Sequence, residues 1–246
     1  MEKRSSPWPL SVPSWVMPGT YAENIRFITE QPEIRGVELL FFLYDDEIKK
    51  QFLAEYEEIA SFSGRFVFTA HLPEVLAERH EELIETLLPL VRHFIVHPGK
   101  DGGIETQAAL INTWAEKYWS PGPPRFLAEN TSPGLLEKTL PLLNSRVGFC
   151  MDTGHLLLEK RSPAEYFSRY GGRIAEIHLH GLDREKAAID GRLPDHRPVT
   201  EDAPWFRELF PLIENFKGII NLEVFSWEEA ARSIAALQGA AQGRPN

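Results

Sequence analysis

Side chains that commonly bind divalent metal ions recur near the ends of short apolar segments of this chain. His71 lies near the end of RFVFTAHL, and His97 ends HFIVH. Carboxylates take the same place further along, with Glu129 in RFLAEN, Asp152 in VGFCMD and Glu223 in IINLEVF. Histidine and carboxylate ligands without cysteine partners suit zinc, manganese, iron or a similar divalent ion. We therefore expect a metal site built from these side chains.

Further candidate ligands occur as pairs within a few residues of one another. They are Asp152 and His155 in DTGH, His178 and His180 in IHLH, and Asp195 and His196 in PDH. Taken one at a time, such residues are more often helix caps or hydrogen-bonded side chains than ligands. Their repetition favours the functional interpretation, because charges that converge in one place repel each other and lose hydration. Bound cations would remove both costs.

The elements that must position these side chains are short apolar runs alternating with longer segments of helical periodicity. The runs are rich in β-branched and aromatic residues, as strands are. They span residues 10–16, 36–42, 65–72, 93–97, 125–130, 147–152, 174–180 and 219–225. Candidate helices span residues 45–61, 79–91, 105–119, 133–143 and 227–237. Ser162 with Pro163, and Ser132 with Pro133, have the residue types of a helix N-cap and its first position.

The alternation of eight strands with helices predicts a parallel α/β sheet. A length of 246 residues favours closure into a single (β/α)8 TIM barrel domain covering residues 1–246. An open, doubly wound sheet is the alternative. No glycine-rich dinucleotide fingerprint follows the first run, which removes the usual reason to prefer that arrangement.

Side chains on a strand alternate between two faces, and in a barrel one face points inward. Glu176, His178 and His180 share one face of their strand, whereas Ile177 and Leu179 share the other. The same alternation lets the other candidate ligands point inward near the carboxyl ends of their strands. Catalytic groups of (β/α)8 barrels lie at that end.

The segment 181–203 is the longest expected connection between a strand and the following helix. Long loops in compact domains are often functional. We expect this one to cover the site and to deliver His196 as a ligand. Its basic residues Arg184, Arg192 and Arg197 are candidates for binding a substrate phosphate, with Lys186 beside them. The alternative is a charged loop that is simply solvated.

Composition limits the classes of partner. A net charge of -10 disfavours binding to the phosphate backbone of nucleic acids. One cysteine, Cys150, allows no intramolecular disulfide. No apolar run approaches the length of a membrane span, and the first residues lack the apolar region of a signal peptide. We expect a cytoplasmic protein with a small-molecule substrate and neither a nucleic acid nor a membrane as partner.

Some histidines and aromatic residues have a structural interpretation. We expect His80 and His93 to have surface or capping roles. Aromatic residues that could contact a large flat ligand, with barrel packing as the alternative, are Trp15, Phe41, Phe225 and Trp227.

The ordered segments FTAHLP, IVHPG, LAENT, CMDTGH, IHLHG, PDH and NLEVF resemble the xylose-isomerase-like barrel superfamily. That superfamily includes endonuclease IV, of AP endonuclease family 2, and many sugar isomerases and epimerases. The resemblance covers nearly the whole chain. Within it, NIRFI, GVELLFF and LEVFSWEEAARS look most like the cobamide-remodelling phosphodiesterases.

The resemblance implies two alternative sets of ligands. In the isomerase and epimerase branch one metal is held by residues that match Glu129, Asp152, His178 and Glu223, and the two glutamates shuttle protons. In the endonuclease IV branch a cluster of up to three metals has further ligands, which match His71, His97, His155, Asp195 and His196. The endonuclease pattern separates its loop Asp and His by one residue, whereas Asp195 and His196 are adjacent here.

The extra histidines favour a metal-dependent phosphodiesterase that uses two or three divalent ions. The resemblance to the cobamide-remodelling phosphodiesterases implies a corrinoid as its substrate. We expect catalytic roles for Glu129, Glu223 and His180, with Glu129 between the metals. A sugar or sugar phosphate isomerase or epimerase is the alternative, and a non-catalytic metal- or corrinoid-binding protein is a third. Counting the bound metals separates the first two, and turnover separates both from the third.

Overall fold

Eight parallel strands form a closed barrel in a computed structural model that describes residues 9–99, 103–131 and 134–242. Each strand pairs with the next along the chain, and β8 pairs with β1. The strands are β1 (Leu10–Pro13), β2 (Ile34–Leu40), β3 (Val67–His71), β4 (Val91–Val96), β5 (Phe126–Glu129), β6 (Gly148–Asp152), β7 (Ile174–His178) and β8 (Ile219–Asn221). The predicted (β/α)8 TIM barrel is confirmed.

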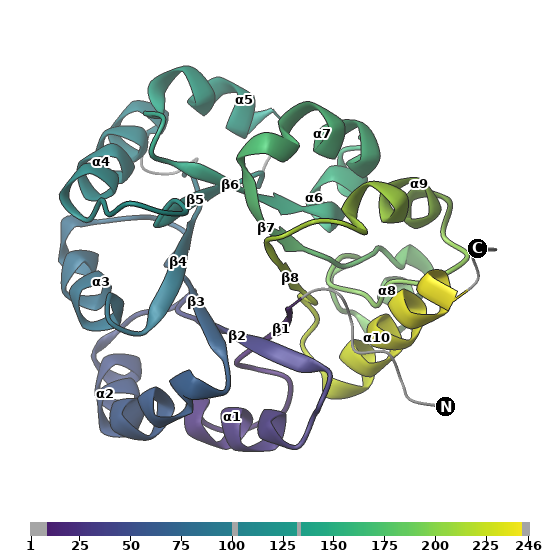
Figure 1. Cartoon of the computed structure of the whole chain (residues 1–246), viewed down its shortest axis with the longest axis horizontal. Coiled ribbons are helices and arrows are strands. Elements are labelled where there is room, and N and C mark those ends of the chain that lie inside the picture. Colours follow the sequence, from purple (N-terminus) through teal and green to yellow (C-terminus); the bar gives the residue numbers. More distant parts are fainter. Residues whose placement is uncertain (1–8, 100–102, 132–133, 243–246) are drawn as a thin grey trace.

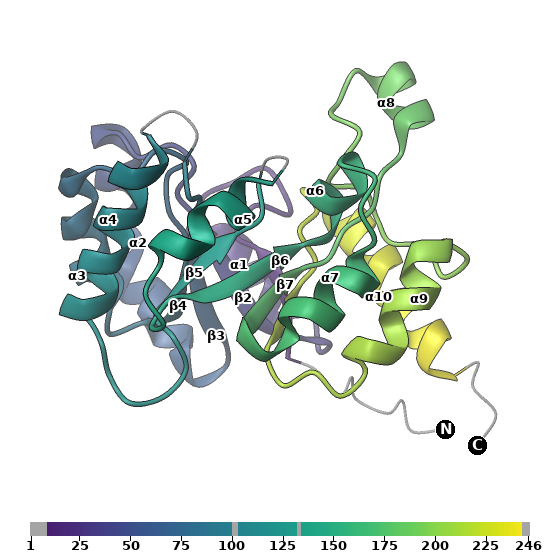
Figure 2. The ribbon, with the colours of Figure 1, turned by 90° about the horizontal axis from the view of Figure 1, so that it is seen from above.

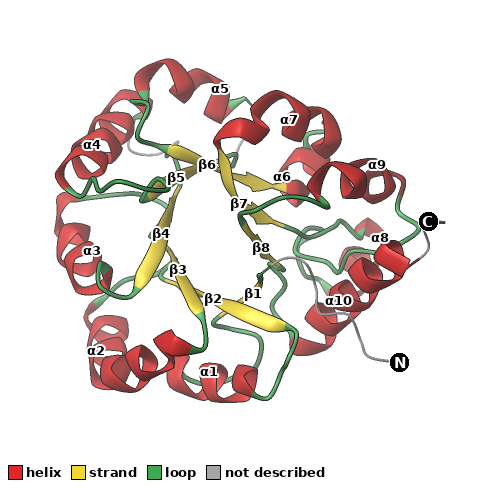
Figure 3. Ribbon diagram, viewed as in Figure 1, coloured by secondary structure: helices red, strands yellow, loops and turns green. Residues whose placement is uncertain are grey.

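Most of the helices surround the barrel as an outer ring (Figures 1 and 3). The helices are α1 (Tyr21–Thr29), α2 (Asp46–Ser61), α3 (Glu81–Leu87), α4 (Ile104–Lys117), α5 (Leu135–Thr139), α6 (Thr153–Leu158), α7 (Pro163–Tyr170), α8 (Arg184–Asp190), α9 (Pro204–Ile213) and α10 (Trp227–Gln242). Short 3-10 turns are η1 (Phe62–Gly64), η2 (Glu78–His80), η3 (Leu140–Leu142) and η4 (Gly171–Arg173). Within the described residues, no helix is both long and apolar enough to cross a membrane.

Several helices begin where a polar side chain caps the first turn. Asp45 accepts hydrogen bonds from the N–H groups of Glu47 and Ile48 at the start of α2. Ser162 accepts one from the N–H of Glu165, which confirms the predicted start of α7. The other predicted cap, Ser132 with Pro133, lies outside the described residues.

Two predicted helices are shorter than expected. Of the predicted helix 79–91, α3 covers only Glu81–Leu87, and β4 already begins at Val91. In the predicted helix 133–143, α5 spans only Leu135–Thr139 and a 3-10 turn follows it. Proline explains both ends, because Pro89 and Pro141 lack the N–H that an α-helix interior needs.

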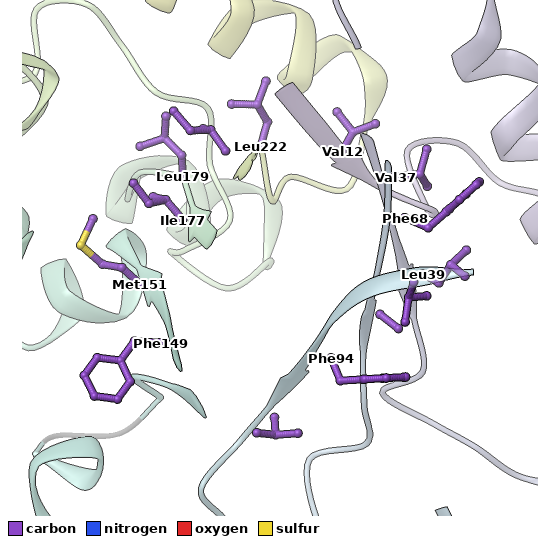
Figure 4. Close-up of a cluster of buried hydrophobic side chains, with 14 of the residues drawn as sticks. Val12, Val37, Leu39, Phe68, Phe94, Phe149, Met151, Ile177, Leu179 and Leu222 are labelled. Carbon is purple, nitrogen blue, oxygen red and sulfur yellow. The ribbon is translucent and has the colours of Figure 1, made fainter. Parts of the chain in front are cut away.

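The core lies mainly between the strands and the helices. Buried side chains from one face of the strands, such as Phe94, Met151 and Ile177, belong to this large apolar cluster (Figure 4). Ile95 and Leu127, on the opposite face of their strands, belong to a separate small cluster. The predicted alternation is therefore confirmed, and the inner face combines this small apolar cluster with buried polar residues such as Thr69 and Glu176. Burying each large apolar side chain stabilises the fold by about 1.5–3 kcal/mol.

Candidate metal centre

The predicted ligands converge at the carboxyl ends of the barrel strands. His71, Glu129, Asp152 and His178 are the last residues of β3, β5, β6 and β7. His97 directly follows β4, and Glu223 lies two residues beyond β8. Neighbouring strands bring these residues side by side, since Asp152 is the ladder partner of His178.

Glu129 lies at the centre of the cluster and is buried. Its Oε1 is 3.3 Å from His155 Nδ1 and 3.6 Å from His97 Nε2. Its Oε2 is 3.4 Å from His71 Nε2 and 3.3 Å from His178 Nδ1. One carboxylate thus faces four histidines, two through each oxygen.

Glu223 faces a second group of histidines across the barrel mouth. Its Oε2 lies 3.1 Å from His178 Nδ1, 3.6 Å from His180 Nε2 and 3.7 Å from His196 Nδ1. His178 Nδ1 therefore lies between the carboxylates of Glu129 and Glu223.

Several groups of side chains have ligand atoms close enough to share an ion. In each group these atoms lie within 4.8 Å of one another. The groups include His71, His97 and Glu129; His155, Asp195 and His196; His180, His196 and Glu223; Glu38, His178 and Glu223; and Glu129, Cys150 and His178. Asp195, although adjacent to His196 in sequence, is thus brought together with two histidines.

A second observation also indicates that these residues fit divalent cations. Several of their inward-facing atoms lack a hydrogen-bond partner. Within the described residues, buried atoms without a hydrogen-bond partner include His97 Nε2, Glu129 Oε2, His178 Nδ1, Asp195 Oδ1 and Glu223 Oε2. Leaving a buried polar group without a partner costs about 1–3 kcal/mol. Cations would satisfy lone pairs on all of these atoms at once.

The carboxylates and histidines of the cluster shift one another's pKa. Burial alone would raise the pKa of Glu129, but His97 and His178 outweigh it and hold that pKa well below its usual value. Burial alone would lower the pKa of His155, but Asp152 and Glu129 raise it to about 10. Without metal, the cluster therefore keeps Glu129 ionised and His155 protonated, whereas burial and His180 lower the pKa of His196.

His178 is oriented by a carboxylate that the sequence analysis did not identify. Glu38, in β2, is fully buried, and its Oε2 accepts a hydrogen bond from His178 Nε2 at 2.9 Å. Asn221 Nδ2 donates to its other oxygen at 3.1 Å. This arrangement keeps the proton on Nε2 and turns Nδ1 toward Glu129 and Glu223. The signal in the sequence was a single acid inside the apolar run GVELLFF.

His180 orients Asp152. Its Nδ1 accepts the backbone N–H of His196 at 2.9 Å, so its proton is on Nε2, which donates to Asp152 Oδ2 at 3.0 Å. In this state neither ring nitrogen has a lone pair free for an ion. Gly154 makes room for the ring, because a Cβ there would lie 2.0 Å from His180 Cε1.

The segment 181–203 brings Asp195 and His196 to the cluster. Gly181 and Arg197 close its base as an antiparallel bridge. His196 adopts a φ of 51°, in the left-handed region. Its Nδ1 lies 3.1 Å from the carbonyl oxygen of Glu223. The segment also forms α8, which stands out from the rest of the barrel (Figure 2).

The three candidate arginines of this segment have different surroundings. Arg197 is buried and pairs through both terminal nitrogens with Asp190, at 2.9 and 3.0 Å. Arg192 pairs with Glu229 at 3.3 Å. Arg184 is exposed on α8. The structure thus gives Arg197 and Arg192 partners within the protein and leaves Arg184 facing solvent.

The expectation that His80 and His93 have surface or capping roles is only partly correct. His80 does accept the N–H of Ala77, as a cap, but it is buried. His93 is buried within β4, where its Nδ1 donates to Pro124 O at 2.6 Å. Burial lowers the pKa of His93 to about 4, so the ring is neutral.

The chain is thus a (β/α)8 barrel with histidines and carboxylates gathered at its mouth, where they could hold metal ions. Residues 35–239 match the model of one family of such barrels, the xylose isomerase-like TIM barrel, and the chain belongs to this family. A comparison with curated proteins finds no significant match.

Solved structures of similar fold carry several different activities. A probable 3-DHS dehydratase from Bacillus anthracis has a TM-score of 0.70 and 12% identity, over 96% of this chain and 99% of its own. The 3-keto-D-glucoside 4-epimerase of E. coli has a TM-score of 0.61 and 13% identity, over 95% and 99%. Endonuclease IV from Thermus thermophilus has a TM-score of 0.55 and 15% identity, over 96% and 100%. At these identities the likeness shows the fold alone.

Proposed function

We propose that this protein is a hydrolase that cleaves phosphodiesters with two or three divalent metal ions. The observation that carries the proposal is the position of Glu129 between two sets of histidines. One set is His97 and His155, which face Oε1, and the other is His71 and His178, which face Oε2. A carboxylate with ligands on both sides suits a bridge between ions.

The number of ligands also supports more than one ion. The single-metal set implied by the resemblance to isomerases uses only Glu129, Asp152, His178 and Glu223. It leaves His71 and His97 on one side, and the group of His155, Asp195 and His196 on the other, without a role. Ions held by these groups account for the whole cluster.

When bound, the metals would act as Lewis acids that neutralise the charge of a phosphodiester. They would also lower the pKa of a bound water molecule toward neutrality. The protein's own residues hold and orient this centre. Glu38 fixes the ring of His178, and His180 fixes the carboxylate of Asp152. Because these supports are buried, the site is organised before substrate arrives.

We propose a cobamide or related corrinoid as the substrate. This choice rests on the likeness of the sequence to the cobamide-remodelling phosphodiesterases. The net charge of -10 supports a small molecule over duplex DNA, whose backbone it would repel.

Sugar isomerisation or epimerisation is the second candidate function. Glu129 and Glu223 both approach His178 Nδ1, at 3.3 and 3.1 Å, so two carboxylates converge on one point. Two such groups could move a proton from one face of a sugar to the other. This candidate requires only one ion.

The test incubates the metal-loaded protein separately with a cobamide, an abasic DNA duplex and a panel of ketoses. We expect a nucleoside-type fragment to be released from the cobamide, and the other substrates to remain unchanged. Ketose interconversion without phosphodiester cleavage would replace this proposal with the isomerase function. Cleavage of the abasic duplex alone would retain the phosphodiesterase and reject the corrinoid.

A further inference from the structure

An apolar pocket of about 480 Å³ adjoins the metal centre. It lies where the carboxyl ends of β1 and β2 meet the first turns of α1 and α2, and Phe225, after β8, completes it. Phe42 and Phe225 line the pocket, and their ring centroids are 6.5 Å apart.

These two rings also touch the metal centre. The centroid of Phe42 is 4.5 Å from that of His71, and the centroid of Phe225 is 4.9 Å from that of His196. The pocket therefore lies next to the candidate metal centre, and the rings of Phe42 and Phe225 form the boundary between the two.

The walls of the pocket offer little polarity to a ligand. The Tyr21 hydroxyl donates to Leu40 O at 2.7 Å, so it presents chiefly its ring. The Ser14 hydroxyl oxygen accepts the N–H of Leu40 at 3.1 Å. Gln51 contributes an amide, and among the described residues that line the pocket none carries a charge.

Large apolar side chains at this pocket are exposed to solvent. Trp15 is 55% exposed and Leu43 is 78% exposed. Exposed apolar side chains gathered beside a polar centre commonly mark a binding site. Of the aromatic residues that the sequence analysis considered for a flat ligand, Trp15 and Phe225 line this pocket. Phe41 is wholly buried in the core instead.

We propose that this pocket binds a planar, uncharged aromatic group of the substrate while the group attached to it reacts at the metal centre. The aromatic walls of Trp15, Tyr21, Phe42 and Phe225 suit a flat ring system. A carbohydrate fits poorly, because its hydroxyl groups need more hydrogen-bond partners than this pocket provides. Gln51 offers an amide, but the hydroxyls of Ser14 and Tyr21 already form hydrogen bonds within the protein. The bicyclic base of a cobamide nucleotide has the required chemistry. Only the identification of the aromatic group as a cobamide base, and of the attached reacting group as its phosphodiester, rests on the proposed function.

The test measures binding without turnover, with indole as the probe and D-fructose as the comparison, in the metal-loaded full chain. Indole is planar, bicyclic and uncharged, and its nitrogen does not ligate metals. We expect calorimetry to detect indole binding but no fructose binding. Trp15→Ala and Leu43→Asp should each weaken indole binding by at least about tenfold, which is about 1.4 kcal/mol.

Two control variants match these changes elsewhere on the surface. Trp119 is also 55% exposed, and Leu53 is 47% exposed on α2, and neither lines the pocket. Trp119→Ala and Leu53→Asp should bind indole as the wild type does. An absence of indole binding to the wild type would overturn the proposal. Equal binding by Trp15→Ala and Trp119→Ala would do the same.

Hydrolysis of bis(4-nitrophenyl) phosphate by the wild type separates this proposal from the proposed function. If indole binds through Trp15 and no hydrolysis occurs, the pocket stands and the phosphodiesterase fails. If hydrolysis occurs and indole does not bind, the pocket fails and the phosphodiesterase stands.

Discussion

At the scale of single residues, the candidate metal centre depends on buried groups that have partners on both sides. Glu129 faces histidines through both of its oxygens, and Glu38 holds the far side of His178. The sequence indicated Glu129, because it ends a strand among other ligand types. It did not indicate Glu38, which lies within β2. Glu38 and His178 are 140 residues apart in the sequence, and they meet only when the barrel closes.

Replacing Glu129 by glutamine should leave the fold intact and lower phosphodiesterase activity by several orders of magnitude. The change keeps the volume and removes the charge that faces four histidines. Metal content and turnover should both be measured, with Glu208→Gln, an exposed acid on α9, as the control. Near-normal turnover of Glu129→Gln would show that the assignment is wrong.

Replacing Glu38 by glutamine should weaken metal binding by about 10- to 100-fold, since partners behind a ligating histidine have effects of that size. The carboxylate that accepts the proton of His178 Nε2 would be lost, although Asn221 could still donate to the remaining oxygen. Competition with a chromogenic chelator gives the affinity, and circular dichroism checks the fold. An affinity equal to that of the wild type would reject the role given to Glu38.

At the scale of elements, the alternation of strands and helices was predictable because each strand is a short apolar run. The ends of strands were less predictable. The runs expected at 174–180 and 219–225 leave the sheet at His178 and Asn221, and so His180 and Glu223 lie beyond the ladder. Hydrophobicity continues past that point, whereas the ladder ends where neighbouring strands diverge. The segment 181–203 was expected to be a loop and contains α8, whose polar residues give little periodicity.

Replacing His196 by alanine tests the role of that segment. We expect one ion fewer per chain, because His196 contributes to the group with His155 and Asp195. Ions held by Glu129 with His71 and His97 should remain. Elemental analysis after gel filtration measures the ratio, with Glu185→Ala, an exposed residue of α8, as a control. Unchanged metal content and kinetics in His196→Ala would reject this role.

At the scale of the whole molecule, metal binding is coupled to protonation. The pKa of His155 is raised to about 10 in the metal-free protein, and those of His71 and His178 are raised as well. Because the pKa is raised in the folded protein, the bound proton stabilises the metal-free fold at pH values below that pKa. A metal ion that binds the same histidine must displace the proton. Metal affinity should therefore increase as the pH rises toward about 10, and binding at neutral pH should release protons. Calorimetric titration in buffers of different ionisation enthalpy gives the number released, and a value of zero would contradict these protonation states.

The most direct test of the central claim is the number of divalent ions bound per chain. It can be measured by elemental analysis of the fully loaded protein together with anomalous scattering from crystals. We predict at least two ions, with Glu129 between them and with His71, His97 and His196 among the ligands. A fully occupied site that holds a single ion, with those three histidines remote from it, would contradict the account.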